Sequence, residues 1–197
     1  MSPPSARERY LPLLLTLAVV AADQIVKAIV EATLPLERPV PVIGDFLRFT
    51  YVHNTAIAFS IGRGIPADLR RVLLLILPLV AIGLISAYYF ATDQLTRGQR
   101  WLLAAIMGGG IGNYVDRVAR PDGVVDFVDV KFYGILGFSR FPTFNVADSS
   151  VVVAGILLLA SSWLVSRPRH DAMDPENGVR EQCVPENGVP ENDEEDR

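Results

Sequence analysis

The sequence has few of the residues that build disulfides and metal sites. It contains one cysteine, Cys183, and two histidines, His53 and His170, which lie far apart along its 197 residues. One cysteine excludes an intramolecular disulfide and argues against a cysteine metal site. The zinc-binding pattern His-Glu-x-x-His does not occur, which argues against a zinc protease.

Charge is scarce too, because 20% of the residues are charged while 50% are hydrophobic. The mean hydropathy of +0.31 is typical of a small membrane protein. A membrane helix needs roughly 20 mainly apolar residues. The stretches 11–30, 72–90, 101–118 and 146–165 meet or nearly meet this need, and the third is the weakest because Gly108–Gly110 and Asn113 interrupt it. The sequence predicts an α-helical integral membrane protein with four transmembrane helices.

The N-terminus resembles a secretory signal peptide, with basic residues in a polar lead (residues 1–10), an apolar run, and then Ala21-Ala22. The run continues past Asp23 and Lys27 to Val30, and three more spans follow. We expect a retained first helix, with a cleaved signal as the alternative.

Two segments read as extramembrane structure. In residues 38–60, β-branched and aromatic residues alternate with polar ones, which predicts a small β-sheet outside the membrane between the first two helices. Pro39 and Pro41 confine their segment to an edge of that sheet. Residues 119–144 carry glycines and several aromatics, which suit an interfacial, partly amphipathic element: Phe132, Tyr133, Phe138 and Phe141.

The C-terminal residues 167–197 have a different composition. From Asp171 onward there are ten acidic and two basic residues, a balance of −8, so the first 170 residues carry +4 of the net −4. The segment Pro-Glu-Asn-Gly-Val occurs twice and begins a third time. Such a sequence buries too little surface to fold, so we expect a disordered acidic tail.

Lys and Arg counts in the loops leave the orientation of the chain in the membrane open.

Two aspartates, Asp126 and Asp148, lie beside long apolar stretches. A carboxylate there is expensive and indicates function, and a pair sharing one proton can activate water. A structural alternative exists, because Asn145 and Asp148 have the spacing of an N-cap and its third helical residue. If the carboxyls meet, the helix start favours ionisation of Asp148, and Asp126 holds the proton.

Other polar residues have structural alternatives as well. Asp23 and Lys27 share a helix face, and both an internal ion pair and a substrate groove remain open. Asn54 is favoured as a turn residue, with hydrogen bonding to a peptide as the alternative.

Asn113, Asp116 and Arg117 also share a helix face. A structural role is favoured, in which Asp116 pairs with Arg117 or a neighbouring helix and Asn113 bonds to backbone, with site support as the alternative. The Gly108–Gly110 run allows a helix or ligand to approach closely.

Five motifs together resemble one family, the bacterial lipoprotein signal peptidases (signal peptidase II). They are Asp23-Gln24-x-x-Lys27, Asn54-Thr55-x-x-Ala58-Phe59-Ser60, Gly112-Asn113-x-x-Asp116-Arg117, Val125-Asp126-Phe127 and Phe144-Asn145-x-Ala147-Asp148. They occur in the family's order, and the resemblance makes residues 11–166 a membrane-embedded peptidase domain.

The resemblance implies an aspartyl protease of the bacterial cytoplasmic membrane that needs no cofactor. The family's catalytic pair falls on Asp126 and Asp148. The matching positions that line or support the site are Asp23, Lys27, Asn54, Asn113, Asp116, Arg117 and Asn145. The family places its site near the outer membrane face, with both termini in the cytoplasm.

The resemblance also implies substrates and an inhibitor. The substrates are prolipoproteins, cut just before a cysteine that carries a diacylglyceryl group, and globomycin inhibits the family. We expect membrane lipids as partners, no nucleic acid, and a monomer. Two features depart from the family: Ala56 stands where a glycine is usual, and the acidic tail has no counterpart.

Two other functions remain as alternatives. A Ser/Lys protease would use Lys27 or Lys131 as the base, with Ser60, Ser149 or Ser150 as nucleophile. A non-enzymatic transporter or assembly factor would use a proton path through Asp23, Asp116 and Asp148.

Overall fold

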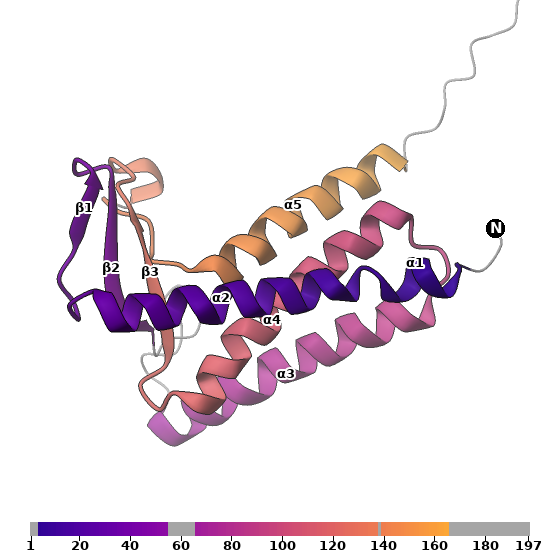
Figure 1. Ribbon diagram of the computed structural model, residues 1–197, viewed down its shortest axis with the longest axis horizontal. Helices are drawn as coiled ribbons and strands as arrows, with labels where there is room; N and C mark the ends of the chain where they lie inside the picture. The colour runs from indigo at the N-terminus through magenta and orange to yellow at the C-terminus, as the bar shows by residue number, and fades with distance from the viewer. Residues whose placement is uncertain (1–3, 55–65, 138, 166–197) are drawn as a thin grey trace, which may run out of the picture. The chain divides into compact units, whose positions relative to one another are not determined.

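The computed structural model describes residues 4–54, 66–137 and 139–165. Within them, the helices are α1 (Ala6–Tyr10), α2 (Leu13–Thr33), α3 (Ala67–Ala91), α4 (Arg97–Ala119) and α5 (Val146–Val165), and the strands are β1 (Val40–Ile43), β2 (Leu47–Asn54) and β3 (Val124–Val130). Figure 1 shows α2 to α5 running alongside one another, with the sheet at one end. The four predicted long helices are present, and α1 adds a turn of helix within the polar lead.

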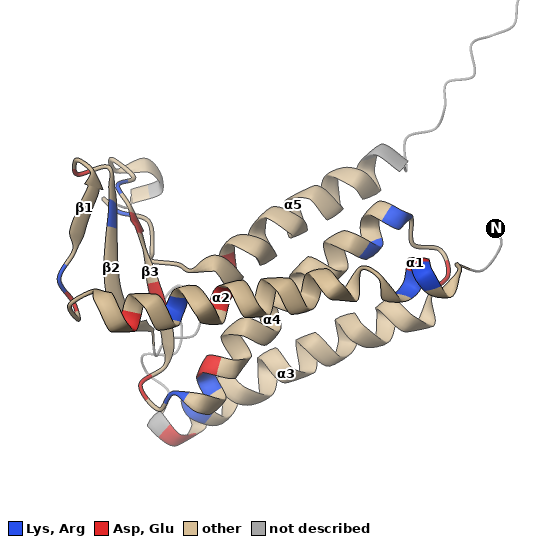
Figure 2. Ribbon diagram, in the orientation of Figure 1, with Lys and Arg blue, Asp and Glu red and all other residues tan. Residues whose placement is uncertain are grey.

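Three helical segments of the described chain are long and apolar enough to cross a membrane: Ala6–Thr33, Asp68–Ala91 and Val146–Trp163. They correspond to the first, second and fourth predicted spans. The remaining helix, α4, is the one whose sequence is interrupted by glycines and polar residues. It packs against α2, α3 and α5, and these neighbours bury the charged residues Arg100 and Asp116. Figure 2 shows that charged residues gather toward the helix ends and the sheet.

Glycines allow α4 to lie close to its neighbours. A Cβ at Gly108 would lie 2.8 Å from Val19 Cβ of α2, and one at Gly112 would lie 2.8 Å from Asp23 Oδ2. A Cβ at Gly109 would overlap the backbone carbonyl of Ala147 in α5. The close approach predicted for this run is therefore confirmed, and the partners that approach are helices.

The sheet has the strand order β1-β2-β3 with antiparallel pairs. Strand β1 is at an edge, as Pro39 and Pro41 predict. The sheet is not built only from the segment between the first two membrane helices, because β3 comes from residues 119–144. In β3, valines alternate partly with Asp126 and Asp129. This alternation indicates a strand, and the prediction of an interfacial element for residues 119–144 did not take it into account. Tyr133 and Phe141 beyond it are exposed.

Some predictions fall on residues outside those described. The acidic tail, Phe138, Ala56 and the rest of the motif from Thr55 to Ser60 lie there.

Candidate active site

Strand β3 places Asp126 in a buried position, 1% exposed, among valines and Phe127. Its Oδ1 accepts a hydrogen bond from Asn145 Nδ2 at 2.7 Å, and its Oδ2 accepts one from Asn54 Nδ2 at 2.9 Å. Burial raises the pKa of Asp126 from its ordinary 3.8 to about 7; the bond from Asn54 opposes this rise, and the charge of Asp148 adds to it. Asp126 is therefore a carboxyl that can hold a proton near neutral pH.

Asp148 lies in the first turn of α5. Its Oδ2 accepts from the backbone N–H of Asn145 at 3.2 Å, and Asn145 Oδ1 accepts from the backbone N–H of Asp148 at 2.9 Å. This reciprocal arrangement is the capping box that the Asn145–Asp148 spacing predicts. The other carboxylate oxygen, Oδ1, accepts from Asn113 Nδ2 of α4 at 2.7 Å. Asp148 therefore caps its helix and also takes part in a network between helices.

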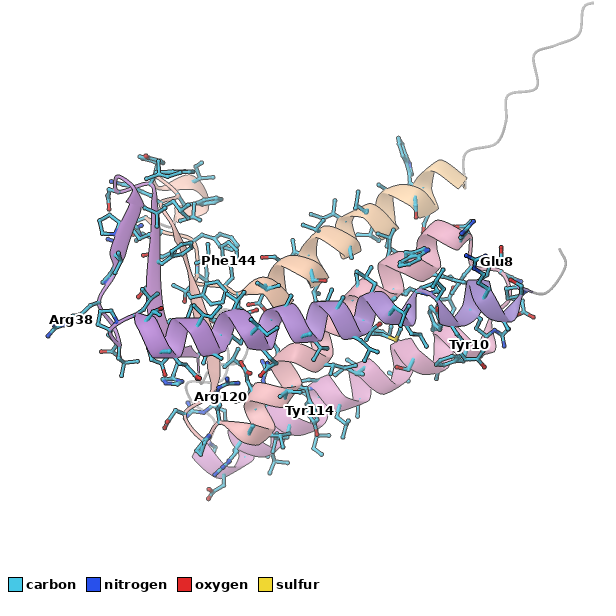
Figure 3. All side chains as sticks on the ribbon, viewed as in Figure 1. Glu8, Tyr10, Arg38, Tyr114, Arg120 and Phe144 are labelled. Atoms are coloured by element: carbon cyan, nitrogen blue, oxygen red, sulfur yellow. The ribbon has the colours of Figure 1, made fainter. Side chains whose placement is uncertain are left out.

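Two asparagines connect the two carboxyl groups. Asn145 Nδ2, which donates to Asp126, lies 3.0 Å from the Oδ1 of Asn113, and Asn113 donates to Asp148. The backbone brings Asn145 to this place because the N–H groups of Phe127 and Val128 both donate to the carbonyl of Phe144. Figure 3 shows Phe144 between the sheet and the start of α5. The two aspartates, 22 residues apart in sequence, thus share one hydrogen-bonded network.

A fully buried ion triad is joined to this network through Asn113. Lys27 Nζ is 2.7 Å from Asp23 Oδ2 and 2.7 Å from Asp116 Oδ2, and all three side chains have no exposed surface. Lys27 also donates to Asn113 Oδ1 at 3.0 Å, and Asp23 Oδ1 accepts from the backbone N–H of Ala147 at 3.0 Å. Of the two possibilities for Asp23 and Lys27, the structure has the internal ion pair, since enclosed side chains do not line a groove.

The third motif differs in detail from the favoured structural interpretation. Asp116 does pair with a neighbouring helix, through Lys27, but its second cation is Arg120 and not Arg117. The side chain of Asn113 bonds to other side chains and not to backbone. Arg117 donates to the Asn113 carbonyl at 3.1 Å. The structure thus connects all nine predicted residues through hydrogen bonds and ion pairs.

Sequence reasoning missed three supporting residues. Gln24 Nε2 donates to Asp116 Oδ1 at 2.8 Å and to the Gly112 carbonyl at 3.1 Å. Arg120 pairs with Asp116 and, at 2.8 Å, with Glu31 of α2. Gln24 lies inside the motif Asp23-Gln24-x-x-Lys27, and Arg120 follows Asp116 by four residues. Their positions in the sequence could therefore have indicated a supporting role. The position of Glu31 gave no such indication.

The arrangement does not assemble a serine–lysine pair among the described residues. Lys27 is held between two carboxylates. The hydroxyls of Ser149 and Ser150 donate to the backbone carbonyls of Asn145 and Ala105. Ser60 lies outside the described residues. The described residues thus place two carboxyl groups in one hydrogen-bonded network.

Comparison with known proteins gives a consistent picture. A lipoprotein signal peptidase of Treponema denticola is 46% identical over 150 residues, covering 76% of this chain and 87% of that protein. One from Treponema pallidum is 46% identical over 156 residues, covering 79% and 84%. A bacterial membrane enzyme solved by the in meso method at 2.3 Å resolution superposes with a TM-score of 0.68 at 25% identity, covering 82% of this chain and 93% of that one.

The family assignment follows from the sequence match, which extends over most of the chain. The family described as "Signal peptidase (SPase) II" matches residues 15–164, from within α2 to the end of α5. With its apolar helices and its sheet at one end of them, this chain is a membrane protease and belongs to the signal peptidase II family.

Proposed function

We propose that the chain is an aspartyl endopeptidase that removes signal peptides from prolipoproteins, with Asp126 and Asp148 activating a water molecule. The observation that carries the proposal is the pair of carboxyl groups joined through Asn113 and Asn145. Asp126 has a pKa raised to about 7, whereas Asp148 lies at a helix start, where the dipole favours the anion. One neutral and one ionised carboxyl is the pairing that this chemistry needs.

In the proposed reaction, Asp148 takes a proton from water while Asp126 donates its proton to the scissile carbonyl oxygen. The product of this step is a neutral tetrahedral diol. It collapses when the proton acquired by Asp148 passes to the leaving amine and a hydroxyl proton returns to Asp126, so the pair ends as it began. Asn54, Asn113 and Asn145 hold the two carboxyls in place. The buried ion triad of Asp23, Lys27 and Asp116 fixes the helices that carry them.

The proposed substrate is a prolipoprotein whose cysteine carries a diacylglyceryl group, cut just before that cysteine. The acyl chains stay in the bilayer while the peptide reaches the sheet. In this proposal α4 also crosses the membrane, as the third of four spans, shielded from lipid by α2, α3 and α5. Both termini are cytoplasmic, the sheet and the active site are near the outer face of the membrane, and the protein is a monomer. Retention of the first helix is part of the proposal, because α2 supplies Asp23 and Lys27.

The test is cleavage of a diacylglyceryl-modified prolipoprotein by the purified full chain in detergent. Asp126→Asn and Asp148→Asn should each lower the rate by about 10³-fold, within the range for loss of a general acid or base. Asp122→Asn is the matched control, since Asp122 is exposed in the loop just before β3. Cleavage at the control rate by either of the first two variants would refute the aspartyl mechanism.

A further inference from the structure

A cavity of about 210 Å³ lies between the start of α3, the end of α4 and the adjoining ends of β2 and β3. We call it the arginine cavity, because four arginines line it: Arg70, Arg71, Arg117 and Arg120. Leu74 and Leu75 also line it, and among the described residues no carboxylate does. A concave site walled by one sign of charge concentrates ligands of the opposite sign.

Among the described residues, two of the four arginines have carboxylates nearby, and one of these, Arg117, feels the charges of Asp148, Asp126 and Asp116 without an ion pair. Arg120 pairs with Glu31 and Asp116. Among the described parts of the chain, no carboxylate is within ion-pair distance of Arg70, Arg71 or Arg117. The cavity therefore has an excess of positive charge. Guanidinium groups hold phosphate oxygens by paired N–H donors, which makes phosphate a well-matched ligand.

One side of the same cavity is apolar, and it lies further along α3 than the two arginines Arg70 and Arg71. Leu74 and Leu75 follow Arg70 and Arg71 by four residues each, so each leucine lies one helical turn below an arginine on the same face of α3. One turn corresponds to about 6 Å along the helix. Helix α3 is apolar enough to cross a membrane from Asp68 onward. If α3 crosses the membrane from this point, its arginines lie at the interface and its leucines at the level where acyl chains begin.

We propose that the arginine cavity binds an anionic phospholipid, with the headgroup phosphate on Arg70 and Arg71 and the first acyl carbons on Leu74 and Leu75. The first half of α3 is open to lipid in this proposal, because its residues Leu69, Val72 and Leu77 are each more than half exposed. A membrane phospholipid therefore has direct access to α3, whereas a soluble acidic ligand would not use the leucine side. Asn54 lines the cavity and also donates to Asp126, so the bound lipid borders the active site.

The test uses the full chain in nanodiscs of equal phosphatidylglycerol and phosphatidylcholine, with native mass spectrometry of the retained lipid. The unmodified chain should retain phosphatidylglycerol in preference to phosphatidylcholine. The double variant Arg70→Gln/Arg71→Gln should lower this preference by about 30-fold, as expected for the loss of two arginine–headgroup interactions. Arg38→Gln is the control, because Arg38 is exposed and Figure 3 shows its side chain pointing away from Arg120, on the outer side of the edge strand β1.

Two outcomes would overturn the proposal. One is an equal lipid preference in the double variant and in Arg38→Gln. The other is displacement of the retained lipid by an acidic peptide but not by its neutral amide analogue, which would make the cavity a peptide site. Asp126→Asn should retain the lipid normally, so failure of the lipid proposal is separate from failure of the proteolytic one.

Discussion

Asn145 donates from its side-chain amide to Asp126 Oδ1 at 2.7 Å while its own Oδ1 caps α5 by accepting from the backbone N–H of Asp148. One side chain thus connects the helix start that carries one aspartate to the strand that carries the other. The two functions of Asn145 use different atoms of its amide, and substitution can therefore separate them.

Asn145→Asp should retain the helix cap, because aspartate caps helices as well as asparagine does. It loses the donor to Asp126 and adds a third carboxyl to the site. We expect cleavage to fall by about 100-fold, in the range for disturbed acid–base catalysis. Because Asn145 is fully buried, the third carboxyl should also lower the melting temperature. Asn145→Ala should lose both the donor and the cap, and so also cost about 1 kcal/mol of stability. Cleavage by Asn145→Asp at the unmodified rate would contradict the need for the donor to Asp126.

The rate should depend on pH through Asp126. Its pKa is raised to about 7, so the carboxyl is neutral below that pH and charged above it. Because the proposed reaction needs neutral Asp126, kcat/KM should fall as pH rises through about 7. Asn54→Ala removes a donor that lowers this pKa, so the alkaline fall should move to higher pH. His53→Gln is the matched control, because His53 precedes Asn54 in β2 and its ring lies against Tyr51. An equal movement of the fall in this control would contradict the role of Asn54.

Gly109→Ala should destabilise the protein. The added Cβ meets the backbone carbonyl of Ala147, which a rotamer change does not relieve, and overpacking of this kind costs about 1–3 kcal/mol. Gly98→Ala is the matched control on the same helix, where a Cβ meets nothing within 4 Å. It should be neutral or slightly stabilising, since alanine favours helix. Thermal unfolding in detergent measures both, and similar melting temperatures would contradict the close packing of α4 on α5.

Lys27→Met should leave Asp23 and Asp116 buried beside each other without their shared cation. Breaking a buried ion pair in this way costs about 3–5 kcal/mol. The control Lys131→Met affects an exposed pair with Asp45, so the melting temperature should change little. The triple variant Asp23→Asn/Lys27→Met/Asp116→Asn removes the unpaired charges and should recover part of the stability. Refolded Lys27→Met with a normal melting temperature but no cleavage would instead favour lysine as a catalytic base.

Local features of the site were predictable because they depend on neighbours in sequence. The Asn145–Asp148 cap uses residues three apart, and the Asp23–Lys27 pair uses residues four apart, so helix geometry alone brings each pair together. The edge position of β1 followed from its proline. By contrast, the sequence left the partner of Asp116 open between Arg117 and a neighbouring helix, and the structure has the helix, through Lys27 of α2. Both Arg117 and Arg120 were available to it nearby, and Lys27 reaches it only when α2 packs on α4.

The sequence by itself determined the four long helices, the edge strand, the helix cap and the residues able to carry acid–base chemistry, since hydrophobic runs, proline and short spacings act locally. Only the tertiary structure decided that β3 joins the sheet beside β2 and that Asn145 reaches both Asp126 and Asn113. It also decided that Lys27 forms ion pairs with both Asp23 and Asp116, which are 93 residues apart. These contacts join groups distant along the chain, each with several chemically acceptable partners, and the packing of glycine-lined helices selects among them.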